Sequence, residues 1–231
     1  MINSNTNGNN GNGFASRWWS SLRWRRSRPS DQDLAPYRRL AVQLHYELPR
    51  PESQRSVLLA TPAETLLCAN GSIALAGCLA EELCRPVLLV DASPRESEVS
   101  HLLDCAARRG FSDFWADPKL PLEELVLPTT QPNLCFLPAG TAVGTSHAAP
   151  AEDLAAWLGA LESRYDFVLL AGGSVLHNSM ALVLAPYVGC VLLLVMEDET
   201  RLDDLEAAQD ALSFCKARKV GLLLTSPVRV V

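Results

Sequence analysis

Residues 62–71 occupy the place in this sequence where a phosphate-binding loop would do its chemistry. They follow a short apolar run at Val57–Ala60 and open a helical pattern that extends to about Leu83. A second apolar run, Val87–Asp91, comes next, so the stretch predicts a strand, a helix and a second, parallel strand. The connection after such a first strand can bind nucleotide through a glycine-rich loop ending in Gly-Lys-Ser/Thr. The glycines let backbone N–H groups surround phosphate, the lysine neutralises it and the hydroxyl holds magnesium.

The loop in this chain has the position of such a site without its chemistry. It reads Pro-Ala-Glu-Thr-Leu-Leu-Cys-Ala-Asn-Gly over residues 62–71, with no lysine and with glycine only at its last position. The helix N-terminus that follows could attract an anion only weakly. We therefore expect no nucleotide cofactor here and no catalytic residue.

Neither the cysteines nor the histidines have the spacing of metal ligands. The cysteines include no C-x-x-C pair and lie mostly in apolar runs, which is typical of core thiols in a reducing compartment. The histidines form no paired ligand set, so we expect no metal site. The cysteines are residues 68, 78, 84, 105, 135, 190 and 215, and the histidines are 45, 101, 147 and 177.

Charge divides the chain into a basic tail and an acidic body. The net charge is −6, but residues 1–30 hold five arginines and no acidic residue, which leaves −11 for the remainder. An acidic body argues against a general nucleic-acid-binding protein. Residues 1–13 lack the apolar run of a signal peptide, and the longest apolar run, 181–196, falls short of the roughly 20 residues that span a bilayer. We expect a cytoplasmic protein.

The tail, residues 1–33, is expected to be disordered and to contact a membrane surface or a membrane protein. Its first 13 residues are low-complexity and bury too little apolar surface to offset the entropy lost on folding. Residues 14–28 then combine arginine, which attracts anionic headgroups, with tryptophan, which settles at membrane interfaces. A solvated linker with incidental tryptophans is the alternative. The candidate contact residues are Trp18, Trp19, Arg23, Trp24, Arg25 and Arg26.

The body, residues 34–231, predicts one α/β domain with a doubly wound, mostly parallel sheet and helices on both faces. Short apolar runs alternate with helical patterns, and a first helix is expected from Asp33 to about Leu48, before Pro49. Ligands of such sheets bind beyond the carboxyl ends of the strands. The expected strands are 57–60, 87–91, 134–137, 167–171, 190–196 and 220–225, and the expected helices are about 70–84, 97–109, 151–163, 178–186 and 200–217.

The order of these segments resembles one family, the cytoplasmic P-loop domain of bacterial tyrosine autokinases from capsule and exopolysaccharide synthesis (the Wzc/CpsD-like group). These are relatives of the MinD/ParA ATPases. The resemblance covers about residues 34–227. APYRRLAVQL is similar to the opening helix of the family, VLLATPAE to the strand before its Walker A loop and RPVLLVDASPR to its second Walker strand. NLCFLPAG, RYDFVLL and ALVLAPYVGCVLLLV are similar to later segments, and the whole implies a P-loop NTPase-like fold.

The departures from that family fall on its functional residues. Aligned without a gap, the Walker A lysine becomes Cys68 and the magnesium hydroxyl becomes Ala69, followed by Asn70. The strand that should end in the Walker B aspartate reaches Ala171 instead. Asp91 is retained in the second Walker motif, either as a vestige of catalysis or as an ordinary strand-end carboxylate that caps the next turn.

Further departures affect recognition and assembly. The D-x-D partner of the retained aspartate is Ser93, and a late Asn-Arg pair that contacts the base becomes Thr225-Ser226. In the opening helix, the E-x-x-R-x-x-R oligomerisation motif keeps only Arg38, which is a candidate subunit contact. The C-terminal tyrosine cluster of the family is absent from this sequence.

The resemblance therefore implies a tyrosine-autokinase-like protein without catalysis. Phosphoryl transfer depends on positioning and on charge neutralisation by metal, lysine and arginine, so the combined losses should abolish it. The leading interpretation is a scaffold or regulatory subunit at the inner face of the inner membrane, which works with an inner-membrane chain-length-determining copolymerase. One alternative is an active autokinase or ATPase with a displaced lysine, Lys119, Lys216 or Lys219. The other is a MinD/ParA-like membrane-associated positioning module. A homo-oligomer is compatible with each, and nucleic acid is not an expected partner.

Overall fold

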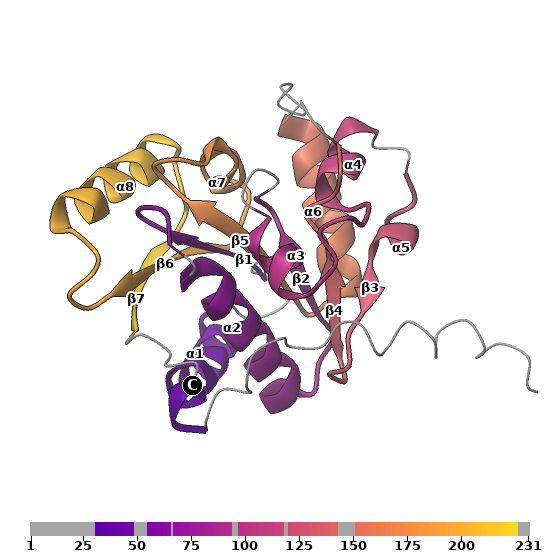
Figure 1. Cartoon of the computed structure of the whole chain (residues 1–231), viewed down its shortest axis with the longest axis horizontal. Helices are drawn as coiled ribbons and strands as arrows, with labels where there is room; N and C mark the ends of the chain where they lie inside the picture. Colours follow the sequence, from indigo (N-terminus) through magenta and orange to yellow (C-terminus); the bar gives the residue numbers. More distant parts are fainter. Residues whose placement is uncertain are drawn as a thin grey trace, which may run out of the picture.

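Seven strands form one sheet in the part of the chain that the computed structural model describes. Their order is β3-β4-β2-β5-β1-β6-β7, and every neighbouring pair is parallel except β3 with β4 (Figure 1). The predicted doubly wound, mostly parallel α/β fold is therefore confirmed. The described residues are 31–48, 55–65, 67–93, 97–117, 120–142 and 151–225. The strands are β1 (Ser56–Thr61), β2 (Val87–Asp91), β3 (Leu127–Pro128), β4 (Leu134–Leu137), β5 (Phe167–Ser174), β6 (Cys190–Met196) and β7 (Val220–Thr225).

Helices cover both faces of this sheet. Buried side chains of α1, α2 and α3 form one core with one face, and those of α4 to α8 form a second core with the other. All residues of β1 and β2 are buried, which explains why these strands are continuous apolar runs in the sequence. The helices are α1 (Asp31–Glu47), α2 (Leu67–Leu83), α3 (Glu98–Leu102), α4 (Phe111–Ala116), α5 (Leu122–Leu125), α6 (Ala151–Arg164), α7 (Ser179–Leu184) and α8 (Leu202–Phe214).

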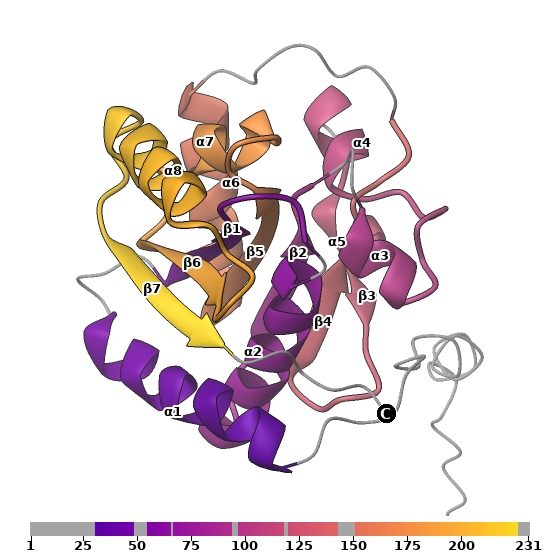
Figure 2. The same ribbon diagram turned by 60° about the vertical axis from the view of Figure 1, so that its left-hand side comes forward.

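Helix α1 packs against α2, as Figures 1 and 2 both show. Its buried side chains are Tyr37, Ala41 and Leu44, three or four residues apart, which is the spacing of one helical face. A side chain added at Gly71 of α2 would overlap Cδ2 of Leu194, whereas its distance to the hydroxyl oxygen of Tyr37 would be an ordinary contact. The absence of a side chain at Gly71 therefore lets α2 pack closely on β6. Burial raises the pKa of Tyr37 to about 12.

The helix predicted over 97–109 is wrong beyond Leu102. Helix α3 ends there because Asp104 has a positive φ of 56° and the next segment bonds to the sheet instead. The backbone N–H groups of Phe111 and Ser112 donate to the carbonyls of Pro138 and Ala139, both at 2.8 Å. These N–H groups belong to the first turn of α4 and have no acceptor within that helix, so the bonds fix the start of α4 at the end of β4. Helices α4 and α5 and the antiparallel strand β3, all short, were not predicted from the sequence.

Two glycines predict opposite effects of the same substitution. A Cβ at Gly110 would lie 2.0 Å from the carbonyl oxygen of Pro138, whereas a Cβ at Gly159 of α6 would meet no atom within 4 Å. We expect Gly110→Ala to lower the free energy of unfolding by about 1–3 kcal/mol, because backbone must move at the end of β4. Gly159→Ala should raise it by roughly 0.5–1 kcal/mol, because alanine favours a helix. Urea unfolding measures both, and a neutral Gly110→Ala would contradict the close contact.

Candidate functional site

Three neighbouring strands, β2, β5 and β1, bring the residues expected at a nucleotide site to one edge of the sheet. Asp91 ends β2 and is paired in register with Ala171 of β5, which is paired in turn with Leu59 of β1. The N–H of Ala92 donates to the carbonyl of Ala171 at 2.9 Å. The positions of the second Walker aspartate, the Walker B residue and the first loop are thus adjacent. Ala171, on the middle strand, offers only a methyl group.

The first turn of α2 turns its side chains inward. Leu67, Cys68 and Ala69 are all buried, with 5% or less of each residue exposed. The thiol of Cys68 donates to the backbone carbonyl of Leu59 at 3.3 Å. Burial raises the pKa of this thiol to about 12, so it stays protonated and is a poor nucleophile. The residue at the lysine position therefore contacts the sheet.

Strand β5 continues past its expected end and bonds to the start of the loop after β1. It extends to Ser174 through a one-residue bulge, in which Gly173 has a positive φ of 69°. Beyond the bulge, the N–H groups of Val175 and Leu176 donate to the carbonyls of Thr61 and Pro62, at 2.8 and 3.2 Å. These bonds fix residues 61–62 against β5. The strand prediction of 167–171 was too short.

Glycines at residues 172 and 173 allow β5 to form the bulge and to lie close to β1. A Cβ at Gly172 would lie 2.7 Å from Cδ1 of Leu58, so a side chain at that position would push β5 away from β1. Asn178 then anchors the far end, because its amide donates to the carbonyl of Gly172 at 3.1 Å and its side-chain oxygen caps α7 at the N–H of Met180. Asn before a helical pattern is a cap signal that could have been used.

The carboxylate of Asp91 is buried and surrounded by donors from its own chain. One oxygen accepts from the N–H and hydroxyl of Ser93, at 3.3 and 3.1 Å. The other accepts from the N–H and hydroxyl of Ser100, at 2.8 and 2.7 Å. The hydroxyl of Ser100 also accepts from the N–H of Ala139, which ties α3 to the end of β4. Burial raises the pKa of Asp91, and the donors of Ser100 and Ser93 oppose that rise.

Comparison with solved structures finds domains with the same fold. The BceF tyrosine kinase domain superposes with a TM-score of 0.71 at 23% identity, over 87% of this chain and 80% of that one. The kinase domain of Escherichia coli tyrosine kinase Etk gives 0.74 at 19% identity, over 86% and 77%. The chain has the fold of bacterial tyrosine kinase domains. The cell-division protein MinD of Aquifex aeolicus is more distant, with a TM-score of 0.55 at 16% identity over 74% and 68%. No protein-family model and no curated protein matches the sequence.

Within this kinase-domain fold, two lysines lie far from the first loop. Lys216 and Lys219 precede β7, and the carbonyl of Lys219 accepts from Val191 at the start of β6. Both therefore lie at the amino end of the parallel strands, whereas the loop follows their carboxyl end. A strand length of roughly 17–20 Å separates the two edges. Lys119 lies outside the described residues.

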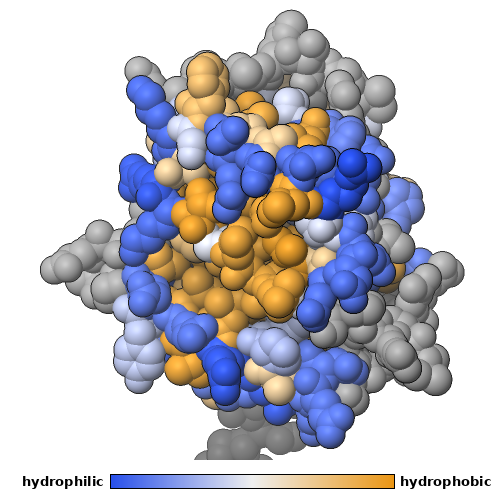
Figure 3. Space-filling view, turned by 90° about the vertical axis from the view of Figure 1, so that its left-hand side faces the viewer, coloured by the Kyte–Doolittle hydropathy of each residue, from blue (hydrophilic) through white to orange (hydrophobic). Residues whose placement is uncertain are grey.

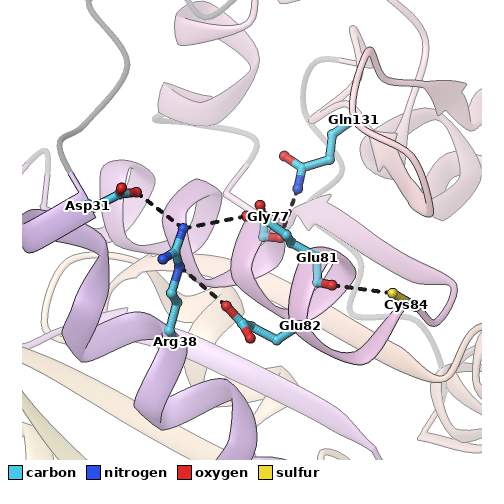
Figure 4. Close-up of polar contacts among 7 residues, drawn as sticks. All are labelled: Asp31, Arg38, Gly77, Glu81, Glu82, Cys84 and Gln131. Atoms are coloured by element: carbon cyan, nitrogen blue, oxygen red, sulfur yellow. Dashed lines mark hydrogen bonds and ion pairs between the residues drawn. The ribbon is translucent and has the colours of Figure 1, made fainter.

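Arg38, the candidate subunit contact, is paired inside the chain. Its guanidinium lies 3.3 Å from carboxylate oxygens of both Asp31 and Glu82 and 3.9 Å from one of Glu81 (Figure 4). Two of these partners belong to α2, so Arg38 links α1 to α2. Its side chain is 34% exposed, so each pair contributes little, about 0–1 kcal/mol.

A groove of about 620 Å³ adjoins this ion-pair cluster. It runs along α2 from Ile73 to Cys84 and is bounded by Leu34 of α1 and by the turn at 130–133. The side-chain amide of Gln131 crosses it and donates to the carbonyl of Gly77 at 2.9 Å (Figure 4). The turn precedes β4, so the groove opens toward the amino end of the sheet, away from the nucleotide edge.

Several residues at the nucleotide edge were missed by sequence reasoning. Ser100 lies in the part of the predicted helix that the structure confirms, but a single serine gives no signal of a buried contact. Ser174 is buried, and its hydroxyl lies 3.2 Å from the carbonyl oxygen of Pro62 and 3.0 Å from Nδ1 of His177. Both serines fasten backbone segments together.

The remaining expectations fall partly outside the described residues. Trp18, Trp19, Arg23, Trp24, Arg25 and Arg26 all belong to the undescribed N-terminal residues. Among residues 31–225, apart from the undescribed gaps, no group of three His, Cys, Asp or Glu side chains could hold a metal ion. No helix in the described part of the chain is both long and apolar enough to cross a membrane.

The buried carboxylate gives a pH prediction. Because the folded state raises the pKa of Asp91, its contribution to stability is present below the unfolded pKa of about 3.9 and is lost as pH rises through the folded pKa. Asp91→Asn removes this titration. We therefore expect the free energy of unfolding of the variant, relative to wild type, to rise between pH 4 and pH 8.

Urea unfolding at several pH values measures this difference. Asp153→Asn, an exposed position on α6, controls for the loss of one charge. A variant that lost stability relative to wild type as pH rose would show instead that the ionised carboxylate stabilises the fold.

Proposed function

We propose that this protein is a catalytically inactive, tyrosine-autokinase-like protein. It acts as a scaffold or regulatory subunit in exopolysaccharide or capsule synthesis and export. The observation that supports it most directly is the position of Cys68, which the resemblance aligns with the family's phosphate-binding lysine. Its thiol is buried and donates to the carbonyl of Leu59. The fold shared with tyrosine kinase domains supports the assignment to that class.

Three local features argue against phosphoryl transfer. A buried thiol cannot neutralise a triphosphate, and the methyl group of Ala171 cannot position magnesium or water. Asp91, the one acidic residue retained from the motifs, already accepts four hydrogen bonds inside the protein. Each transition-state contact of this kind is typically worth about 3–4 kcal/mol, so their joint loss should reduce the rate by many orders of magnitude.

The proposal predicts that the full chain does not bind ATP with magnesium. Isothermal titration should show no saturable heat, which corresponds to a Kd weaker than about 1 mM. A catalytically active tyrosine kinase domain of the same fold, titrated in parallel, is the positive control. Transfer of radiolabel from the γ-phosphate of ATP to the protein should be absent as well.

Micromolar ATP binding or stoichiometric labelling would favour the alternative, an active autokinase or ATPase with a displaced lysine. Lys119 would then be the residue to replace. Lys216 and Lys219 lie at the opposite edge of the sheet, so their replacement would serve as the control.

The proposed partner is an inner-membrane copolymerase that determines chain length, and the proposed location is the inner face of that membrane. The arginines and tryptophans of residues 14–28 support a contact with anionic lipid or with the partner. Arg38 is a further proposed contact, because a third of its side chain is exposed beside the α2 groove.

The tail predicts binding to membrane. We expect the full chain to sediment with vesicles containing anionic lipid and to dissociate as salt rises, since each arginine near the surface contributes about 1 kcal/mol. Replacing Trp18, Trp19 and Trp24 together by alanine should reduce binding by about tenfold or more. Tyr46→Ala, an exposed aromatic residue on α1, is the matched control.

The outcomes separate lipid from protein contact. Vesicle binding that survives the triple replacement would contradict the assigned role of the tryptophans. Binding to the cytoplasmic segment of a copolymerase, without vesicle binding, would assign the tail to that partner. Vesicle binding with no copolymerase binding would favour a MinD/ParA-like positioning module.

A further inference from the structure

Strand β7 forms one edge of the sheet. It stands last in the strand order, and within the described residues it pairs only with β6. Its six residues, Val220–Thr225, contain no charge and no proline. Natural proteins usually shield such an edge with a charged residue, a proline, a bulge or a covering segment, because its free N–H and C=O groups pair readily with another strand.

One face of β7 is also apolar and exposed. Leu222 is paired in register with Leu193, which belongs to the core under α8, so Val220, Leu222 and Leu224 point to the α8 side of the sheet. They are 40%, 53% and 61% exposed. Helix α8 covers β6 and leaves this row uncovered, and Phe214 at its end is 88% exposed. Figure 3, which faces this side, shows a continuous apolar area within a hydrophilic surround.

The two ends of this edge carry opposite charge. Lys216, Arg218 and Lys219 are exposed and precede β7 at its amino end. Glu197, Asp198 and Glu199 are exposed and follow β6, whose last residue is paired with Thr225 at the carboxyl end of β7. The edge is therefore basic at one end and acidic at the other.

We propose that β7 pairs antiparallel with β7 of a second copy of this chain, which joins the two sheets across a two-fold axis. Centred on Leu222, this pairing sets each Val220 opposite the Leu224 of the other copy, so both apolar rows meet on one face. The basic end of each copy then lies beside the acidic end of the other. Opposite residues of an antiparallel pair share a face, and such cross-strand pairs stabilise a sheet.

Charge and symmetry select a second copy as the occupant. A parallel strand with the same charge distribution would set basic beside basic and acidic beside acidic, which is unfavourable. The antiparallel arrangement satisfies both ends at once, as the self-complementary interface of a two-fold dimer requires. It uses neither Arg38 nor the residues of the first loop, so it can fail or hold independently of the function proposed above.

Sedimentation velocity of the full chain over a concentration series tests the pairing. Wild type should show a reversible monomer–dimer equilibrium. Leu222→Lys sets two like charges opposite each other at the axis and should raise the dimer Kd at least about 30-fold. Val42→Lys, on the exposed side of α1, changes a side chain of similar exposure and should leave Kd unchanged.

A charge-reversal cycle tests the orientation of the two copies. Lys216→Glu with Arg218→Glu should weaken the dimer by about tenfold, and so should Glu197→Lys with Glu199→Lys. Mixing the two reversed proteins, or combining all four changes in one chain, should restore association. Circular dichroism of each variant verifies that it is folded, and loss of association by an unfolded variant is not counted.

Hydrogen exchange locates the contact. Backbone amides of β7 should exchange more slowly at dimer-forming concentrations than at monomer concentrations, and those of α1 should not change. A monomer at every concentration, a dimer that persists in folded Leu222→Lys, or a dimer without added protection in β7 would each overturn the proposal.

Discussion

The hydrogen bonds between the end of β5 and the start of the loop after β1 fix the backbone at the carboxyl edge of the sheet. In a sheet of this kind, the carboxyl ends of the strands are where a ligand would bind. Here Val175 and Leu176 donate to Thr61 and Pro62, so the chain itself occupies backbone groups at that edge. The bulge at Gly173 makes the extension possible. The buried first turn of α2 agrees with this arrangement. Its side chains, like the carbonyls of Thr61 and Pro62, contact the protein itself.

Asp91 is likewise bonded to groups of its own chain. A carboxylate that is to hold magnesium or polarise water must keep a lone pair accessible, whereas the oxygens of Asp91 accept from Ser93 and Ser100. Since Ser100 in turn binds Ala139, the group connects β2, α3 and β4. Its retention is explained by this structural role, because replacing it would leave several buried donors without an acceptor.

The sequence predicted the parts of the fold in which local pattern and tertiary environment agree. The buried strands β1, β2 and β6 are apolar along their length and lie where expected. That Cys68 and Ala171 stand at the positions of the family's lysine and aspartate stays a prediction. The helix over 97–109 failed because the chain leaves the helix at Asp104, which has a left-handed backbone, and the N–H groups of Asp104 and Cys105 close α3 by donating to the carbonyls of His101 and Ser100. The extension of β5 could not be foreseen, since Gly172 and Gly173 are more often a sign that a strand stops. The role of Ser100 depends on a partner 39 residues away in sequence.

Exposed apolar side chains are concentrated on the edge strand β7. At the carboxyl edge of the sheet the side chains of Cys68 and Asp91 are buried, whereas β7 presents Val220, Leu222 and Leu224 to solvent. Leaving such a row exposed is unfavourable unless another surface covers it, because about 25 cal/mol is gained per Å² of apolar area removed from water. Among the described residues, the β7 edge is thus the surface best suited to association.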